Sequence, residues 1–170
     1  MNDALARWNG LQFFEAAEEI LPCCGSKAWA RGVAARRPIH DEAALLITCD
    51  EVWKELPESD WMEAFRSHPR IGESRASASA LAQSVSWSKT EQQRVSAADD
   101  EVKRALAEGN RAYEQTFGYI FIICATGKSS AEMLTILQDR LHNDPDRELR
   151  IAAEEQSRIT QLRLKKLLEV

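Results

Sequence analysis

The stretch Ser67-His68-Pro69-Arg70-Ile71-Gly72 follows an amphipathic run, Asp60-Trp61-Met62-Glu63-Ala64-Phe65. We expect the rest of the chain to support this stretch. The first run has helical character, whereas Pro69 moves His68 away from helical backbone angles and fixes the backbone that follows. Gly72 then permits a turn that other residues resist. The pattern predicts a histidine held at the end of a helix, at the rim of a pocket.

His68 is the candidate acid or base. It is one of three histidines in the chain, and the ordinary pKa of imidazole, about 6.5, suits proton transfer near neutrality. Taken alone, the hexapeptide is equally compatible with a surface loop whose histidine has no role.

The composition predicts a globular protein without a polyanionic partner. The 170 residues suit one domain, 1–170, and they are 44% hydrophobic and 29% charged. A net charge of −5 argues against general binding of nucleic acid or anionic membranes. No apolar run approaches the ~20 residues of a membrane span, and we expect neither a signal peptide nor a peroxisomal address.

The cysteines are expected to be free thiols in a reducing, cytoplasmic compartment. Cys23 and Cys24 are adjacent, while Cys49 and Cys124 are distant singles in apolar surroundings. A cysteine nucleophile is an alternative, but we expect Cys49 and Cys124 to be small core residues. The cysteine spacing does not match a zinc site, and no two histidines share a metal-ligand spacing, so we predict no metal.

The apolar periodicity is almost entirely helical, which predicts an all-α fold with at least six helices and no sheet. In the first helix, 11–21, we expect Asn9 as the N-cap, Phe14 on the inward face and Pro22 as the stop. Later helices are expected to start at Ser26, at Asp41, at Ser59 or Asp60, at Ser88, at Ser129 and near Asp146.

Two segments have no clear helical period. Residues 73–88 are polar and serine-rich, and they fit either a loop that acts as a lid or a surface excursion. Residues 119–124 form an apolar run that is too short to assign as helix and fits a buried extended segment.

Ser88-Lys89-Thr90-Glu91 has the spacing of a capping box, which predicts that Glu91 and Gln92 open a helix. Capping is the simplest role for Glu91. A carboxylate and an amide at this place are also able to orient a substrate or to tune His68.

Gly127-Lys128-Ser129 is not a phosphate-binding P-loop, because that motif needs a glycine where Ile122 stands. Backbone N–H groups of residues 124–127, ahead of a helix start, are still candidates for receiving a carboxylate or other polar oxygens. The alternative is a plain helix start.

Arg163 lies on the apolar stripe of the last helix, four residues after Ile159 and four before Leu167. An arginine seldom faces a core without a partner. If it is buried or faces a pocket, its guanidinium is suited to bind a carboxylate or a urea-like group through a fork of two hydrogen bonds. The alternatives are a structural ion pair and a side chain that extends to solvent.

Six segments together resemble the 2-oxo-4-hydroxy-4-carboxy-5-ureidoimidazoline (OHCU) decarboxylase family, over nearly the whole chain. The two most specific are His68-Pro69-Arg70-Ile71-Gly72 and Ile159-Thr160-Gln161-Leu162-Arg163-Leu164. The others are 34–38, 88–92, 117–129 and 140–144.

The resemblance implies a single all-helical domain, often a homodimer, that uses no metal or organic cofactor. It implies a lyase that converts a small ureidoimidazoline to (S)-allantoin during urate degradation. Alternatives are a non-catalytic helical binding module and a related lyase or hydrolase acting on another ureido acid.

By resemblance, the catalytic residues are His68, Glu91 and Arg163. The implied substrate contacts are Pro69, Ser88, Lys89, Thr90, Glu91, Gln92, Phe121, Ile122, Ile123, Cys124, Ala125 and Arg163. The chain departs from the family pattern at Ile39, where phenylalanine is common, and in the long serine-rich segment 74–86, which puts the pocket lid in doubt.

Overall fold

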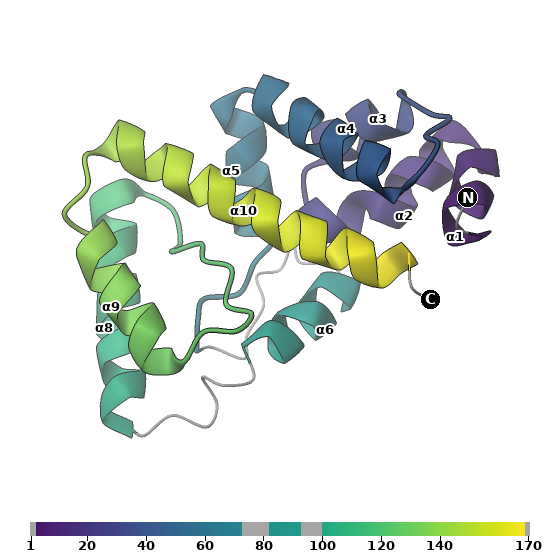
Figure 1. The fold of residues 1–170 in the computed structure, drawn as a ribbon. Helices are drawn as coiled ribbons and strands as arrows, with labels where there is room; N and C mark the ends of the chain where they lie inside the picture. The colour runs from purple at the N-terminus through teal and green to yellow at the C-terminus, as the bar shows by residue number, and fades with distance from the viewer. Residues whose placement is uncertain (1–2, 73–81, 93–99, 169–170) are drawn as a thin grey trace. The chain divides into compact units, whose positions relative to one another are not determined.

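Helices make up the regular structure of the computed structural model, which describes residues 3–72, 82–92 and 100–168 (Figure 1). Over these residues there are nine helices and no strand. They are α1 (Asp3–Gly10), α2 (Phe13–Cys24), α3 (Lys27–Ala34), α4 (Glu42–Glu55), α5 (Glu58–Arg66), α6 (Ala82–Glu91), α8 (Asp100–Phe117), α9 (Ser130–Arg140) and α10 (Pro145–Leu168).

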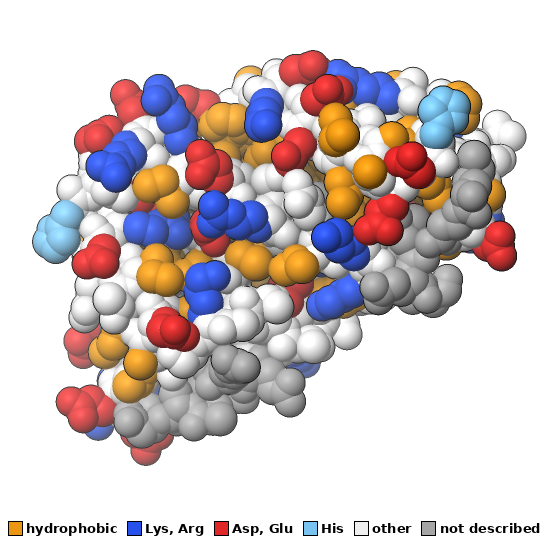
Figure 2. Space-filling view, in the orientation of Figure 1, with side chains coloured by type: hydrophobic (Ala, Val, Ile, Leu, Met, Phe, Trp, Pro, Cys, Tyr) orange, Lys and Arg blue, Asp and Glu red, His pale blue; other side chains and the backbone are white. Residues whose placement is uncertain are grey.

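The predicted all-α fold is therefore confirmed. None of the described helices is both long enough and apolar enough to span a bilayer. Side chains of both charge signs are interspersed over the face drawn in Figure 2. The helices group into two compact units, 1–64 with 157–170 and 65–156. The expectation of a single domain stays a prediction.

The start of the first unit differs from the sequence prediction in two ways. Asn9 does not cap α2, because its side chain bonds instead to the backbone N–H and C=O of Ile39, at 3.0 and 2.8 Å. The N-cap is Gln12, within a capping box that Glu15 completes. Residues 3–10 form α1, a helix that the sequence analysis did not predict.

Pro22 does not stop α2, which continues to Cys24 and ends at Gly25, a residue with φ of 91°. The Gly25 N–H donates to the carbonyl of Leu21 and closes the last turn. Phe14 was expected to face inward and is instead 66% exposed.

The two following helices start where the sequence predicted. The Ser26 hydroxyl accepts from the N–H of Trp29 at the start of α3, and the Asp41 carboxylate accepts from the N–H of Ala44 at the start of α4. Within this unit α3 packs against both α2 and α4.

In the second unit, Ser88 lies inside α6 and Glu91 is its last residue, so the predicted capping box is wrong. Residues 73–81 of the candidate lid, 73–88, lie outside the described part of the chain, and 82–88 are helical. Gly118, with φ of 81°, follows α8. The predicted capping box of Ser129 and Glu132 is present at the start of α9, which packs against α8.

Residues 119–124, expected as a possible buried extended segment, are not helical, and 121–125 are buried. They join the core cluster of the second unit, which contains Tyr113, Phe121, Ile123, Met133 and Leu137. Among the described residues no strand lies beside this segment to form hydrogen bonds with its backbone.

Candidate active site

The loop 67–72 leaves α5 through a turn in which the N–H of His68 donates to the carbonyl of Phe65, at 3.2 Å. At the other end Gly72 has φ of 84°, the left-handed region where a side chain would be strained. Pro69 between them is partly buried. These features match the turn that the sequence predicted at this place.

Side chains from α8, and from Gln92 just after α6, hold the part of the loop that follows Pro69. Asn110 donates to the carbonyl of Ile71 at 3.0 Å, and the Gly72 N–H donates to the side-chain oxygen of Gln92 at 3.1 Å. Arg70 forms a two-pronged ion pair with Glu114. The loop therefore has a defined shape even where it is exposed.

The imidazole of His68 is 8% exposed and lies against α10. Its Nε2 is 2.7 Å from the side-chain oxygen of Gln156, a residue with no exposed surface. This contact joins residues 88 positions apart. The candidate acid/base group is thus both buried and oriented.

The end of α6 brings further candidate residues to the loop. Gln92 contacts it directly, and Glu91 and Gln92 are both half-buried. Ser88 is buried, whereas Lys89 and Thr90 are exposed. Glu91 ends its helix, so its carboxylate does not cap a helix start, and its role at the site stays a prediction.

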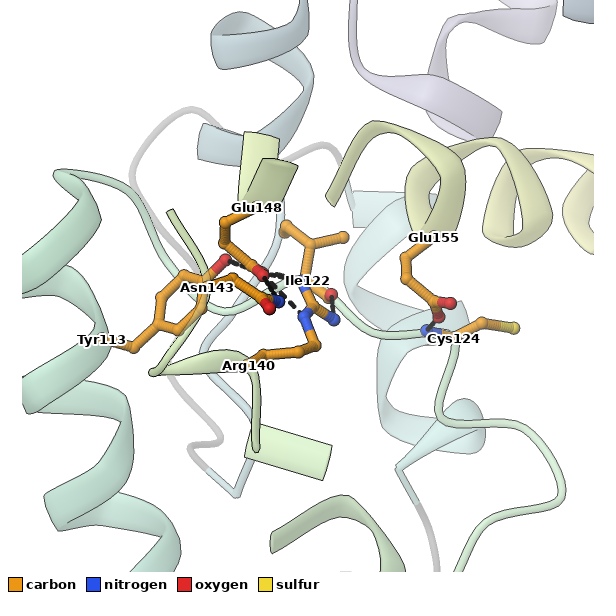
Figure 3. A network of polar contacts seen from close by, with 7 residues as sticks. All are labelled: Tyr113, Ile122, Cys124, Arg140, Asn143, Glu148 and Glu155. Carbon is orange, nitrogen blue, oxygen red and sulfur yellow. Dashed lines mark hydrogen bonds and ion pairs between the residues drawn. The ribbon is translucent and has the colours of Figure 1, made fainter. Parts of the chain in front are cut away.

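Two buried charged side chains hold the backbone of 121–125 (Figure 3). Arg140 donates to the carbonyl of Ile122 at 2.7 Å, and the Cys124 N–H donates to the Glu155 carboxylate at 2.7 Å. The expectation of an open anion site is thus wrong at Cys124, because a carboxylate of the chain already takes that N–H.

Arg140 is the centre of the network in Figure 3. Its guanidinium pairs with Glu148 at 2.5 Å and lies 4.6 Å from the ring centre of Phe121. The Glu148 carboxylate also accepts from the Tyr113 hydroxyl at 2.5 Å and from the Asn143 amide at 2.9 Å. This fully buried carboxylate is therefore satisfied by three donors.

Electrostatics place Glu91 in the neighbourhood of Cys124. Burial raises the pKa of the Cys124 thiol, Lys128 opposes this rise, and the carboxylates of Glu155 and Glu91 add to it. A thiol with a raised pKa is a poor nucleophile at neutral pH. The interpretation of Cys124 as a small buried residue agrees with this environment.

Arg163 belongs to the first unit and has no exposed surface. One of its contacts is a donation to the carbonyl of Pro22, at 3.3 Å. It also lowers the pKa values of Cys23 and Cys24, against the larger effect of burial. The prediction that this arginine faces inward is confirmed.

The second unit thus gathers His68, Glu91, Gln92 and 121–125, all of which were singled out from the sequence. Gln156 and Asn110 were not predicted from the sequence. Both carry the signal that identified Arg163, a polar residue on an apolar helical stripe: Gln156 is four residues after Ala152, and Asn110 four after Leu106.

A sequence profile described as OHCU decarboxylase matches residues 9–165. The chain belongs to the OHCU decarboxylase family. It is 39% identical over 153 residues to the Arabidopsis thaliana protein named uric acid degradation bifunctional protein TTL, covering 88% of this chain and 46% of that protein. It is 40% identical over 60 residues to the Amia calva 2-oxo-4-hydroxy-4-carboxy-5-ureidoimidazoline decarboxylase, covering 35% and 34%.

One solved structure agrees with this membership, and a second shows a similar fold. A crystal structure of OHCU decarboxylase in the presence of (S)-allantoin has a TM-score of 0.77 and 35% identity, covering 90% of this chain and 99% of that one. The fold of (S)-allantoin synthase is also similar, with a TM-score of 0.73, 15% identity and coverage of 96% and 53%. The matches with the curated family relatives span less than half of their length.

Proposed function

We propose that the chain is a lyase that decarboxylates 2-oxo-4-hydroxy-4-carboxy-5-ureidoimidazoline to (S)-allantoin in urate degradation, without a cofactor. Family membership supports this, as does the similarity to an OHCU decarboxylase structure determined in the presence of (S)-allantoin. The observation that carries the proposal is the buried His68, whose imidazole is oriented by Gln156 within a loop that Gln92 and Asn110 also hold.

The proposed reaction does not require a cofactor. Decarboxylation needs a sink for the electron pair of the broken C–C bond, and the C=N bond of the substrate ring supplies one. What remains is to position the substrate, to remove the hydroxyl proton and to protonate one face of the ring. An imidazole, a carboxylate and an arginine suffice for these tasks.

In this proposal His68 transfers the proton, Glu91 orients the imidazole or the substrate hydroxyl, and Arg163 binds the substrate through a forked contact. Further substrate contacts are proposed for Pro69, Ser88, Lys89, Thr90, Gln92, Phe121, Ile122, Ile123, Cys124 and Ala125.

The test is to generate the substrate from urate with urate oxidase and the upstream hydrolase, and to follow allantoin chirality by circular dichroism. His68→Asn is expected to lose about 10²–10⁴ in rate and to yield nearly racemic allantoin, because spontaneous decay then dominates. His142→Asn, at an exposed histidine, is the matched control.

Formation of (S)-allantoin at the parent rate by a folded His68→Asn protein would contradict the proposal. So would a loss of turnover explained by unfolding, which far-ultraviolet circular dichroism detects.

We also propose a cytoplasmic homodimer. The four free, buried cysteines suit a reducing compartment, and the exposed Phe14 and Ile47 are apolar surface that an interface would cover. Light scattering coupled to size-exclusion chromatography measures the mass directly, and a monomer at micromolar concentration would contradict the dimer.

A further inference from the structure

The contact between Gln156 and His68 determines which imidazole nitrogen carries a hydrogen. The side-chain oxygen of Gln156 lies 2.7 Å from Nε2. A carboxamide oxygen accepts hydrogen bonds and donates none, so this bond requires a hydrogen on Nε2. In the neutral imidazole, Nδ1 is then the nitrogen with the lone pair.

The surroundings make Gln156 an effective partner. Its side chain has no exposed surface, so bulk water does not compete for the imidazole. An amide fixes the tautomer without adding a charge, whereas a carboxylate would also favour the imidazolium. The preceding residue, Glu155, is bound to the Cys124 N–H at 2.7 Å, which fixes this turn of α10.

We propose that Gln156 is a positioning residue that holds His68 with a hydrogen on Nε2, and that Nδ1 is the atom that exchanges a proton with the substrate. The tautomer is a property of the resting protein. The role of Nδ1 rests on the proposed decarboxylase function.

The reaction balances with Nδ1 in this role. As carbon dioxide leaves, the C–C bonding pair forms a C=C bond within the ring, and the electrons of the former C=N bond go to its nitrogen, which takes a proton from solvent. Nδ1 removes the hydroxyl proton as the carbonyl forms, and then returns it to the carbon that bears the ureido group. His68 ends neutral, with the Nε2 hydrogen never displaced.

The tautomer is measured directly by nitrogen-15 NMR of protein labelled at histidine. The chain has three histidines, so His68→Asn identifies the His68 signals by their loss. We expect the parent protein to show a hydrogen on Nε2 and an unprotonated Nδ1 in neutral His68. Gln156→Met has a side chain of similar length without an oxygen, and it is expected to shift His68 to a mixture of tautomers.

In the same variant, kcat is expected to fall at least about tenfold while KM changes less than about threefold, since orientation and not binding is lost. Gln138→Met places the same substitution at an exposed glutamine of α9 and is expected to leave the spectrum and kcat unchanged. Gln156→Glu keeps an acceptor oxygen and is expected to keep the hydrogen on Nε2. If Gln156→Met fails to fold, Gln156→Glu decides the matter: a carboxylate in contact with Nε2 favours the imidazolium, so His68 is expected to titrate at higher pH than in the parent, and an unchanged titration would overturn the contact.

A parent His68 with its only hydrogen on Nδ1 would overturn the proposal, as would a Gln156→Met spectrum identical to the parent one. A shifted tautomer with unchanged kcat would overturn the assignment of Nδ1. If the parent protein makes no (S)-allantoin, the proposed function fails, and the NMR measurement still decides whether Gln156 sets the tautomer.

Discussion

Replacing Glu148 by glutamine is expected to lower the free energy of unfolding by about 3–5 kcal/mol, because it leaves the charge of Arg140 buried without its counter-charge. The side chains of Arg140 and Glu148 are 7% and 0% exposed, and their closest atoms are 2.5 Å apart. Glutamine keeps the shape of the side chain and one acceptor oxygen. The variant therefore isolates the loss of charge from any loss of packing.

The expected change is large enough to measure without ambiguity. In a chain of this size each kcal/mol shifts the melting temperature by roughly 2–4 °C, so the melting temperature should fall by about 6–20 °C. Urea unfolding followed by far-ultraviolet circular dichroism gives the free energy itself.

Glu19→Gln is the matched control. The pair of Arg7 and Glu19 is also 2.5 Å apart, but its side chains are 56% and 24% exposed. Ion pairs that water and salt screen contribute little, so we expect almost no change in the unfolding midpoint. Equal losses in the two variants would refute the argument that burial, and not proximity, sets the strength of the Arg140–Glu148 pair.

Two further predictions concern Arg163 and Cys24. Arg163→Lys keeps the charge but loses the forked pair of hydrogen bonds. It should lower kcat/KM at least about tenfold, since a charged hydrogen bond contributes on the order of 1.5–3 kcal/mol. Unchanged steady-state kinetics would show that Arg163 is purely structural. Burial raises the pKa of Cys24 to about 12, so above pH ~8.5 the unfolded thiol loses a proton that the folded thiol keeps, and stability falls as pH rises. Cys24→Ala should make that fall shallower by up to about 1.4 kcal/mol per pH unit between pH ~9 and ~11, and identical slopes in urea unfolding at several pH values would contradict this.

The capping pattern predicted a helix start correctly where a turn precedes the helix. Ser129 caps α9 two residues after Gly127, whose φ is 83°. Ser88 and Glu91 have the same spacing, yet the residues before Ser88 continue a helix, so the hydroxyl lies inside α6. A four-residue pattern predicts a helix start only when the preceding residues cannot themselves be helical.

Long-range pairings were beyond prediction from the sequence. Asn9 is a good N-cap by type, but its amide satisfies the backbone of Ile39, 30 residues away. His68 was identified from its local setting, whereas its partner Gln156 is 88 residues away. Type and spacing identify a candidate, but only the packed chain determines which partner it has.

The segment 121–125 shows why charged residues lie inside this helical unit. Buried backbone groups need hydrogen-bond partners, and among the described residues no strand lies beside the segment to supply them. Arg140 bonds to the carbonyl of Ile122, and Glu155 bonds to the N–H of Cys124. Two oppositely charged side chains, one from α9 and one from α10, thus provide backbone hydrogen bonds that a neighbouring strand would provide in a sheet.

Glu155 also links this segment to the proposed acid/base group. The next residue along α10 is Gln156, which bonds to His68. One turn of one helix therefore orients both the segment proposed to contact substrate and the imidazole proposed to transfer the proton. A substitution that shifts this turn should disturb substrate contacts and proton transfer together, whereas Gln156→Met should disturb proton transfer alone.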